Sequence, residues 1–252
     1  RVGDATRVTV REVDVQTQFI GPPQQADVKR REELLPQLFR TVLSAFAPIA
    51  RVDSAEGKEV KLRLRGAALP SRDASLRTVQ PNDVFQPVIR YNHADGRARK
   101  INHLPWTYLL AEATDGVTVT CQMHSGLRGQ PLSGRRRDRF EKLALLIHPP
   151  GGDTDVQLVS RDESHRPLAG YEVYAYPPND RTPQLLGRTD RNGKLLVEST
   201  DAPLLTIVVK NGRQFLARFP VMPGLQDELE ALDYDDGTRL AAAGFVNGMQ
   251  ER

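Results

Sequence analysis

The pattern of apolar and polar residues changes its period several times along the chain. The segment from Asp27 to Phe46 has apolar residues at every third or fourth position, which is typical of one face of an amphipathic helix. These residues are Leu35, Leu38, Phe39, Val42, Leu43 and Phe46. Pro36 is expected to kink this helix or to begin its second half, since the first helical position needs no intrahelical N–H bond. The sequence therefore predicts one helix near the N-terminus.

Beyond Pro48 the pattern alternates and predicts strands. Val60, Leu62 and Leu64 lie on one face of a hairpin that turns at Gly57. Further strands are expected at residues 7–15, 84–91, 107–113, 117–123 and 143–148. Several short strands with a single helix favour a mainly β domain over residues 1–148, built as a small SH3-like barrel decorated by the helix.

The sequence Pro149-Pro150-Gly151-Gly152 marks a domain boundary, because it can neither extend a central strand nor continue a helix. A chain of 252 residues is also long enough for two compact domains. Six further strands are expected between Val156 and Phe219, and the Asn-Gly pairs at positions 192–193 and 211–212 favour tight hairpin turns. Residues 153–222 are therefore predicted to form a second β domain.

Two motifs of the second domain carry a family resemblance. Residues 167–173 read Pro-Leu-Ala-Gly-Tyr-Glu-Val, and residues 189–195 read Thr-Asp-Arg-Asn-Gly-Lys-Leu. This pattern resembles the carboxypeptidase regulatory-like, or transthyretin-like, β-sandwich over residues 154–220. The resemblance implies an accessory module of an exported protein, in the periplasm, the cell envelope or a secreted assembly, and it supplies no catalytic residues. Residues 79–85 have a fainter resemblance to SH3-like domains of bacterial envelope and flagellar assembly proteins.

Helical spacing returns in residues 224–252 and predicts a short helical tail. Leu225, Leu229 and Leu232 indicate a first helix, and Ala241, Phe245 and Met249 indicate a second. Isolated helices shorter than about 12 to 15 residues are marginal in water, so their apolar stripes need a surface to cover. We expect Phe245 and Met249 to contact a neighbouring subunit, with the chain's own sandwich as the alternative.

The strongest concentration of charge is a set of arginines in a loop that also contains glycine and proline. Its members are Arg128, Arg135, Arg136, Arg137 and Arg139. They could bind the phosphates of a nucleic acid, a lipopolysaccharide or a phospholipid surface. The interpretation that we favour is a solvated loop paired with Asp138, Glu141 and neighbouring subunits. The whole chain has 35 Lys and Arg against 32 Asp and Glu, so its net charge of +3 does not by itself predict nucleic-acid binding.

The sequence contains no arrangement that predicts catalysis, a cofactor or a metal site. Its five histidines lack the spacing with which one helix or hairpin holds a metal, and residues 190–193 form a turn rather than a calcium loop. Cys121 is the single cysteine, which excludes an intramolecular disulfide, and we expect it to be a buried structural thiol. No apolar run approaches the roughly 18 residues that span a bilayer.

Together these features predict a non-catalytic structural or binding subunit of an oligomeric assembly in the cell envelope or outside the cell. Its expected partners are further copies of itself or other envelope proteins. The alternative is a module that binds a polyanion or nucleic acid through the arginine loop, and a third possibility is an enzyme whose site forms only on folding.

Overall fold

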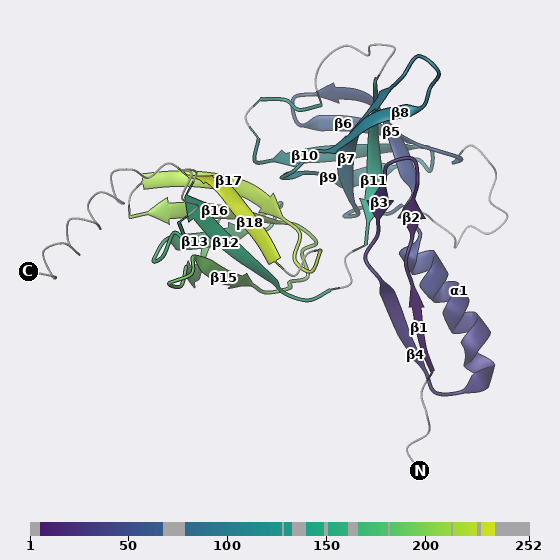
Figure 1. The fold of residues 1–252 in the computed structure, drawn as a ribbon, viewed down its shortest axis with the longest axis horizontal. Coiled ribbons are helices and arrows are strands. Elements are labelled where there is room, and N and C mark those ends of the chain that lie inside the picture. Colours follow the sequence, from purple (N-terminus) through teal and green to yellow (C-terminus); the bar gives the residue numbers. More distant parts are fainter. Residues whose placement is uncertain are drawn as a thin grey trace, which may run out of the picture. The chain divides into compact units, whose positions relative to one another are not determined.

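The chain divides into two compact units, residues 1–150 and residues 151–252. The computed structural model describes residues 6–67, 79–127, 129–132, 140–148, 151–160, 166–180, 182–212, 214–225 and 228–234. The division falls inside the segment from Pro149 to Gly152 that the sequence marks as a boundary. Each unit is built mainly from β-strands, as the sequence predicts (Figure 1).

The first unit contains a closed six-stranded barrel. Its strands, in order around the ring, are β5 (Ile49–Glu56), β6 (Glu59–Leu64), β10 (Thr118–Ser125), β9 (Thr107–Thr114), β7 (Val84–Asn92) and β11 (Phe140–Ile147). The ring closes because β11 pairs with both β5 and β7, while β8 (Ala98–His103) extends the sheet beyond β7. The predicted small barrel is confirmed.

The barrel interior is filled by the residues that alternate with polar ones along each strand. Val60, Leu62 and Leu64 of β6 are buried on one face, as the alternation predicts, and their neighbours in sequence are exposed. They join a core that includes Phe85 and Cys121, both fully buried. Burial of these side chains supplies the hydrophobic stabilisation of the barrel.

The first unit also carries an extension that we call the N-terminal arm. It consists of β1 (Thr6–Val10), the antiparallel β4 (Gln24–Val28), a 3₁₀ turn (Arg31–Glu33) and helix α1 (Leu34–Ala45). Figure 1 shows α1 alongside β1 and β4, and these two strands are its main neighbours. A small hairpin of β2 (Val13–Asp14) and β3 (Phe19–Ile20) joins the two arm strands.

The predicted helix is confirmed, but it begins later than the sequence pattern suggests. Asp27 and Val28 belong to β4, where they pair with Arg7 and Thr6 of β1. Pro36 lies in the first turn of α1, where a backbone N–H has no intrahelical acceptor, so this proline costs the helix no hydrogen bond. The helix packs on β1 and β4 of the N-terminal arm.

The second unit has two small sheets. The first contains β15 (Lys194–Val197), β12 (Thr154–Ser160) and β18 (Glu228–Tyr234), and the second contains β14 (Gln184–Arg188), β13 (Glu172–Tyr176), β16 (Leu205–Asn211) and β17 (Gln214–Val221). Val156 and Leu158 of the first sheet are buried, as are Val173 and Ile207 of the second. The unit therefore has its own apolar core.

Strand β18 corrects the first half of the predicted helical tail. Residues 228–234 pair in parallel with β12, with Val156 opposite Leu229 and Leu158 opposite Ala231. The sequence Glu-Leu-Glu-Ala over residues 228–231 fits the period of two of a strand as well as helical spacing. The strand forms because the backbone of β12 offers hydrogen-bond partners, and a local sequence pattern does not show that such partners are nearby. The second predicted helix, with Phe245 and Met249, lies outside the described residues.

The turn at Asp190 is held by its own side chain. One carboxylate oxygen of Asp190 accepts hydrogen bonds from the N–H groups of Asn192 and Lys194, both at 2.8 Å. Gly193 has a φ angle of +73°, and a Cβ there would lie 2.4 Å from the carbonyl oxygen of Leu158. The segment is a turn, as predicted, and it needs glycine for both its conformation and its close packing.

Candidate functional site

Helix α1 attaches to the arm strands through the face that carries Leu34, Gln37, Thr41 and Ala45. Thr41 is the buried residue of α1, and its hydroxyl donates a 2.7 Å hydrogen bond to the carbonyl oxygen of Gln37. Leu34 and Ala45 are half-buried. At about 100° of rotation per residue, these four positions fall on one side of the helix. The helix therefore holds to the arm without using its most apolar face.

That most apolar face is exposed, and it is the feature of the structure that most needs a functional explanation. We call it the α1 stripe; its members are Leu35, Leu38, Phe39, Val42 and Leu43 of α1 and Phe46, the C-cap residue that follows the helix. Leu35 exposes 75% of its surface and Phe39 exposes 57%. Amphipathic helices of globular proteins normally turn such a stripe toward a core. Within the part of the chain that the structure describes, all six members of the stripe are exposed.

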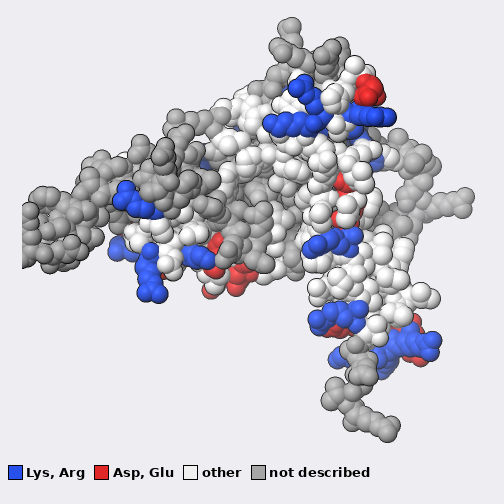
Figure 2. Space-filling model, in the orientation of Figure 1, with Lys and Arg blue, Asp and Glu red and all other residues white. Residues whose placement is uncertain are grey.

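Charged residues lie mainly beyond the α1 stripe. Figure 2 shows Lys, Arg, Asp and Glu side chains gathered at the end of the arm farthest from the barrel, with a mostly uncharged surface between. That end includes the ion pair of Arg7 Nε with Asp27 Oδ1 at 2.8 Å. Within α1 itself Arg40 is the charged residue, and it follows Phe39 on the flank of the stripe.

The arm has few buried side chains of its own. Among its described residues, Val28 and Thr41 are buried, and Val8, Val10 and Ala26 are half-buried. A two-stranded ribbon without a larger apolar face is marginally stable in water. The exposed stripe thus lies on a part of the first unit that has few buried side chains of its own.

Contacts at the base of the arm join it to the barrel. The Glu12 carboxylate accepts a hydrogen bond from the backbone N–H of Ala47, just beyond α1. The ring of His103 lies 3.2 Å from the carbonyl oxygen of Thr17 through Nε2, and Gln24 Nε2 donates to the carbonyl oxygen of His148 at 3.1 Å. These contacts fix the base of the arm on the barrel. They therefore also hold α1 in place relative to the barrel.

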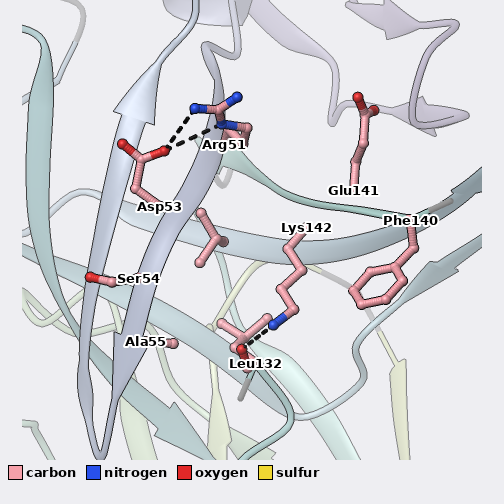
Figure 3. Close-up of a pocket in the computed structure, with 9 residues that line it drawn as sticks. Arg51, Asp53, Ser54, Ala55, Leu132, Phe140, Glu141 and Lys142 are labelled. Carbon is pink, nitrogen blue, oxygen red and sulfur yellow. Dashed lines mark hydrogen bonds and ion pairs between the residues drawn. The ribbon is translucent and has the colours of Figure 1, made fainter. Parts of the chain in front are cut away.

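A second feature is a small pocket, which we call the seam pocket, where β5 and β11 separate (Figure 3). The two strands pair only from Arg51 opposite Leu143 to Ile49 opposite Leu145. Beyond this point β5 has a bulge at Asp53. The resulting cavity of about 140 Å³ is lined by Arg51, Val52, Asp53, Ser54, Ala55, Leu132, Phe140, Glu141 and Lys142.

The charged groups of the seam pocket are paired with one another or with its walls. Asp53 accepts hydrogen bonds from Arg51 Nη2 at 3.0 Å and from Arg63 Nε at 2.7 Å. Burial alone would raise the pKa of Asp53, but these guanidinium partners outweigh it and the pKa is lowered. Lys142 Nζ donates to the carbonyl oxygen of Leu132 at 2.6 Å, and burial lowers its pKa. These interactions hold the wall of the barrel in place.

The residues that the sequence singled out for binding lie outside the described residues. This applies to Arg128, Arg135, Arg136, Arg137, Arg139, Phe245 and Met249. Leu132 and Phe140, which precede and follow the main arginine run, both line the seam pocket. The proposed roles of the seven residues in polyanion binding and assembly stay predictions.

The single thiol is structural. Cys121 is fully buried in the barrel core, and burial, with a smaller contribution from Glu112, raises its pKa to about 12. A thiol with this pKa is neutral at physiological pH and is a poor nucleophile. Within the described residues, no group of three or more His, Cys, Asp or Glu side chains could hold a metal ion. In that same part of the chain, no helix is long and apolar enough to cross a membrane.

The exposed α1 stripe was missed as a site because its sequence signal is the signal of a core-facing helix. A stripe of six apolar residues at three-four spacing predicts burial, and the sequence does not say against what. One signal was available, since the strands before the helix offer few large apolar residues to cover it. In residues 6–28 these are valines and single copies of Phe19 and Ile20.

Comparisons with known proteins find only distant structural similarity. The Bacillus anthracis TIE protein aligns over 82% of this chain and 45% of its own, at 11% identity and a TM-score of 0.25. The group B streptococcus pilus 2b backbone protein aligns over 73% of this chain and 96% of its own, at 10% identity and a TM-score of 0.23. A C-terminal fragment of the pilus adhesin SpaC from Lactobacillus rhamnosus GG aligns over 64% of this chain and 94% of its own, at 10% identity and a TM-score of 0.16.

No protein-family model and no curated protein match the sequence. The chain spans less than half the length of the TIE protein chain that it resembles. At these TM-scores the similarity carries no functional argument, which rests instead on the residues of the arm.

Proposed function

We propose that this chain is a non-catalytic structural or binding subunit that assembles with protein partners through the α1 stripe. The observation that carries the proposal is the exposure of six large apolar side chains on one face of α1. From their exposed fractions, and with roughly 200 Å² for a fully exposed large side chain, the stripe presents on the order of 600 Å². The largest apolar patch of a typical monomer is about 300 to 600 Å² and is often functional.

The arrangement of the stripe supports a protein partner. A helix that lays its apolar side chains on another protein does so through anchors spaced at three and four residues. Leu35, Leu38 and Val42 of α1 and Phe46 at its C-cap have this spacing. The base of the arm is tied to the barrel through Glu12, so the presented face is already ordered and little conformational entropy is lost on binding.

The setting is proposed to be the periplasm, the cell envelope or the outside of the cell. The resemblance of residues 167–173 and 189–195 to transthyretin-like sandwiches supports this setting. The two small sheets of the second unit are compatible with such a sandwich. In this proposal the second unit is a further contact module of the same assembly.

Site-specific photo-crosslinking in cells that produce the full chain tests the function. A photoreactive amino acid at Phe39 should give a protein adduct that mass spectrometry identifies as this chain or as an exported protein. The matched control carries the same amino acid at Ser44, which is exposed on α1 outside the stripe. Equal adducts at both positions, or none at Phe39, would refute the stripe as a protein-binding surface.

A second candidate function is polyanion binding, and one observation favours it. Four arginines surround two carboxylates on the wall formed by β5, β6, β7 and β11. Arg51 and Arg63 flank Asp53, while Arg65 Nη2 and Arg90 Nη1 lie 3.8 and 3.4 Å from Glu141 Oε2. These six side chains, four cations and two anions, carry a net charge of +2. The arginine run of residues 135–139 would extend it in this second proposal.

A further inference from the structure

We infer that the partner of the α1 stripe is a second copy of this chain, whose own α1 packs antiparallel to the first across a two-fold axis. This inference rests on the proposed function, because it names the protein that the stripe binds. The spacing, the charge and the area of the stripe each support it.

The spacing of the stripe is that of a helix-to-helix seam. Leu35, Phe39, Val42 and Phe46 follow one another at intervals of four, three and four residues. These are the intervals of the inward-facing positions of a coiled coil, where each side chain inserts between side chains of the facing helix. Leu38 and Leu43 lie on opposite flanks of this seam and widen it.

The stripe is chemically compatible with a copy of itself. In an interface with two-fold symmetry, the same surface patch occurs on both sides and must be self-complementary. The six members of the stripe are all apolar, so a second copy would bury no unpaired charge against them. Arg40 and Ser44 lie outside the stripe and would stay at the solvated edge.

The helix dipoles favour the antiparallel orientation. A parallel pair would align the two dipoles side by side, whereas an antiparallel pair places the N-terminal end of one helix beside the C-terminal end of the other. The side chains at the N-terminal end carry both signs, because Arg31 stands beside Glu32 and Glu33.

The area of the stripe is sufficient for a specific interface. Two copies that bury about 600 Å² each give about 1,200 Å² in total, which reaches the lower end of specific protein interfaces. This figure counts only the six members of the stripe. Polar side chains at the rim would add to it.

A membrane surface fits these observations less well than a second copy. Helices that lie in a membrane interface carry Lys and Arg along a free polar face. The twelve residues of α1 include a single cation, Arg40, and the face around Thr41 is packed on the arm strands. Vesicle binding by a monomeric wild type would therefore contradict the inference of a second copy.

The test compares the full-length wild type with Val42→Asp, which places a charge in the middle of the stripe. Ser44→Asp is the matched control, because it adds the same charge two residues away on an exposed position outside the stripe. Light scattering coupled to size exclusion should give the wild type and Ser44→Asp twice the 28.1 kDa mass of one chain, and Val42→Asp the mass of one. All three should show the same circular dichroism spectrum.

Disulfide trapping tests the orientation. In an antiparallel pair centred between Phe39 and Val42, residue 39 of one copy lies opposite residue 42 of the other in the middle of the seam. A mixture of Phe39→Cys and Val42→Cys chains should therefore form a mixed disulfide dimer, and each variant alone should form much less. The native Cys121 is buried and does not compete. Efficient self-crosslinking of Phe39→Cys alone, as expected of a parallel pair, would overturn the antiparallel arrangement.

The outcomes separate this inference from the proposed function. A wild type that stays monomeric at high concentration overturns the inference that the partner is a second copy. If Phe39 in that case gives adducts to a different protein, the proposed function of the stripe as an assembly surface still stands. A monomeric wild type that binds anionic vesicles, while Val42→Asp does not, overturns the inference in favour of a membrane. A monomer with neither adducts nor vesicle binding overturns both.

Discussion

The Glu12 carboxylate accepts a hydrogen bond from the backbone N–H of Ala47, 35 residues further along the chain. Ala47 follows the last turn of α1 and leads into the first barrel strand, and the carbonyl oxygen of Glu12 also accepts a 2.9 Å hydrogen bond from the N–H of Gly21. Glu12 therefore links three segments at the base of the arm. Its partial burial raises its pKa, although the N–H of Ala47 opposes this shift, and nearby Asp14 adds to it.

Substitutions at Glu12 should separate its hydrogen bond from its charge. Glu12→Gln keeps an acceptor for Ala47, whereas Glu12→Ala leaves a buried N–H without one and should lower the free energy of unfolding by about 1 to 2 kcal/mol. Chemical denaturation of both variants and the wild type measures the difference. Equal stability of the Gln and Ala variants would contradict a structural role for this bond.

The charge of Glu12 should appear in the pH dependence of stability. Because the folded chain has the higher pKa, it binds the proton more tightly than the unfolded chain does. The contribution of Glu12 to stability is therefore greatest below the ordinary carboxyl pKa and falls as the pH rises through the higher folded value. Glu12→Gln should flatten this decline, which begins as the pH rises above the ordinary carboxyl pKa of about 4.3. An unchanged pH profile would contradict the burial of the carboxylate.

Gly193→Ala should destabilise the second unit strongly. Its φ angle of +73° disfavours a side chain, and the added Cβ would approach the carbonyl oxygen of Leu158 to 2.4 Å. Gly212 is the control, since it also has a positive φ angle of +58° but has open space around it. We expect about 1 kcal/mol of destabilisation at Gly212 and at least 2 to 3 kcal/mol at Gly193. Thermal unfolding of both alanine variants provides the comparison, and equal losses would argue against the close packing.

The arginine run allows a direct test of the second candidate function. Replacement of Arg135, Arg136 and Arg137 by alanine should remove polyanion binding if that run provides the phosphate contacts. On duplex DNA each lost contact should reduce the slope of log affinity against log salt by about 0.9. Titrations of DNA at several salt concentrations measure this slope. Tight and salt-insensitive binding by the triple variant would exclude this run as the polyanion site.

Local periodicity was sufficient to predict the barrel core. Val60, Leu62 and Leu64 alternate with charged residues, and a strand that faces water on one side must bury its apolar side. The same reasoning located Cys121 in a strand, where it is buried. These predictions succeeded because the identity of the buried face depends on neighbours only two residues apart.

Predictions that depended on distant partners were less successful. The periodicity of Leu35 to Phe46 predicted the helix but could not show that Thr41, rather than Phe39, faces the arm strands. Likewise the leucines at 225, 229 and 232 suggested a helix, whereas residues 228–234 add a parallel strand to β12. In both cases the structure depends on a partner surface that is distant in sequence, namely the arm strands for α1 and strand β12 for residues 228–234. The residues of the segment itself carry no information about that surface.

The second unit should fold without the first, provided that β18 is included. Strand β12 lies between β15 and β18, so a fragment that ends at residue 220 leaves one edge of β12 without its five pairings to β18. It also removes Gly224, whose N–H donates a 2.9 Å hydrogen bond to the Thr154 hydroxyl.

A fragment of residues 151–234 should therefore unfold cooperatively in urea. Residues 154–220 should lose about 2 kcal/mol or more of stability, at about 1 kcal/mol for each net hydrogen bond. Circular dichroism during urea titration measures both fragments. Equal stability would exclude β18 from the folded unit, and failure of the longer fragment to fold would show that the second unit depends on the first.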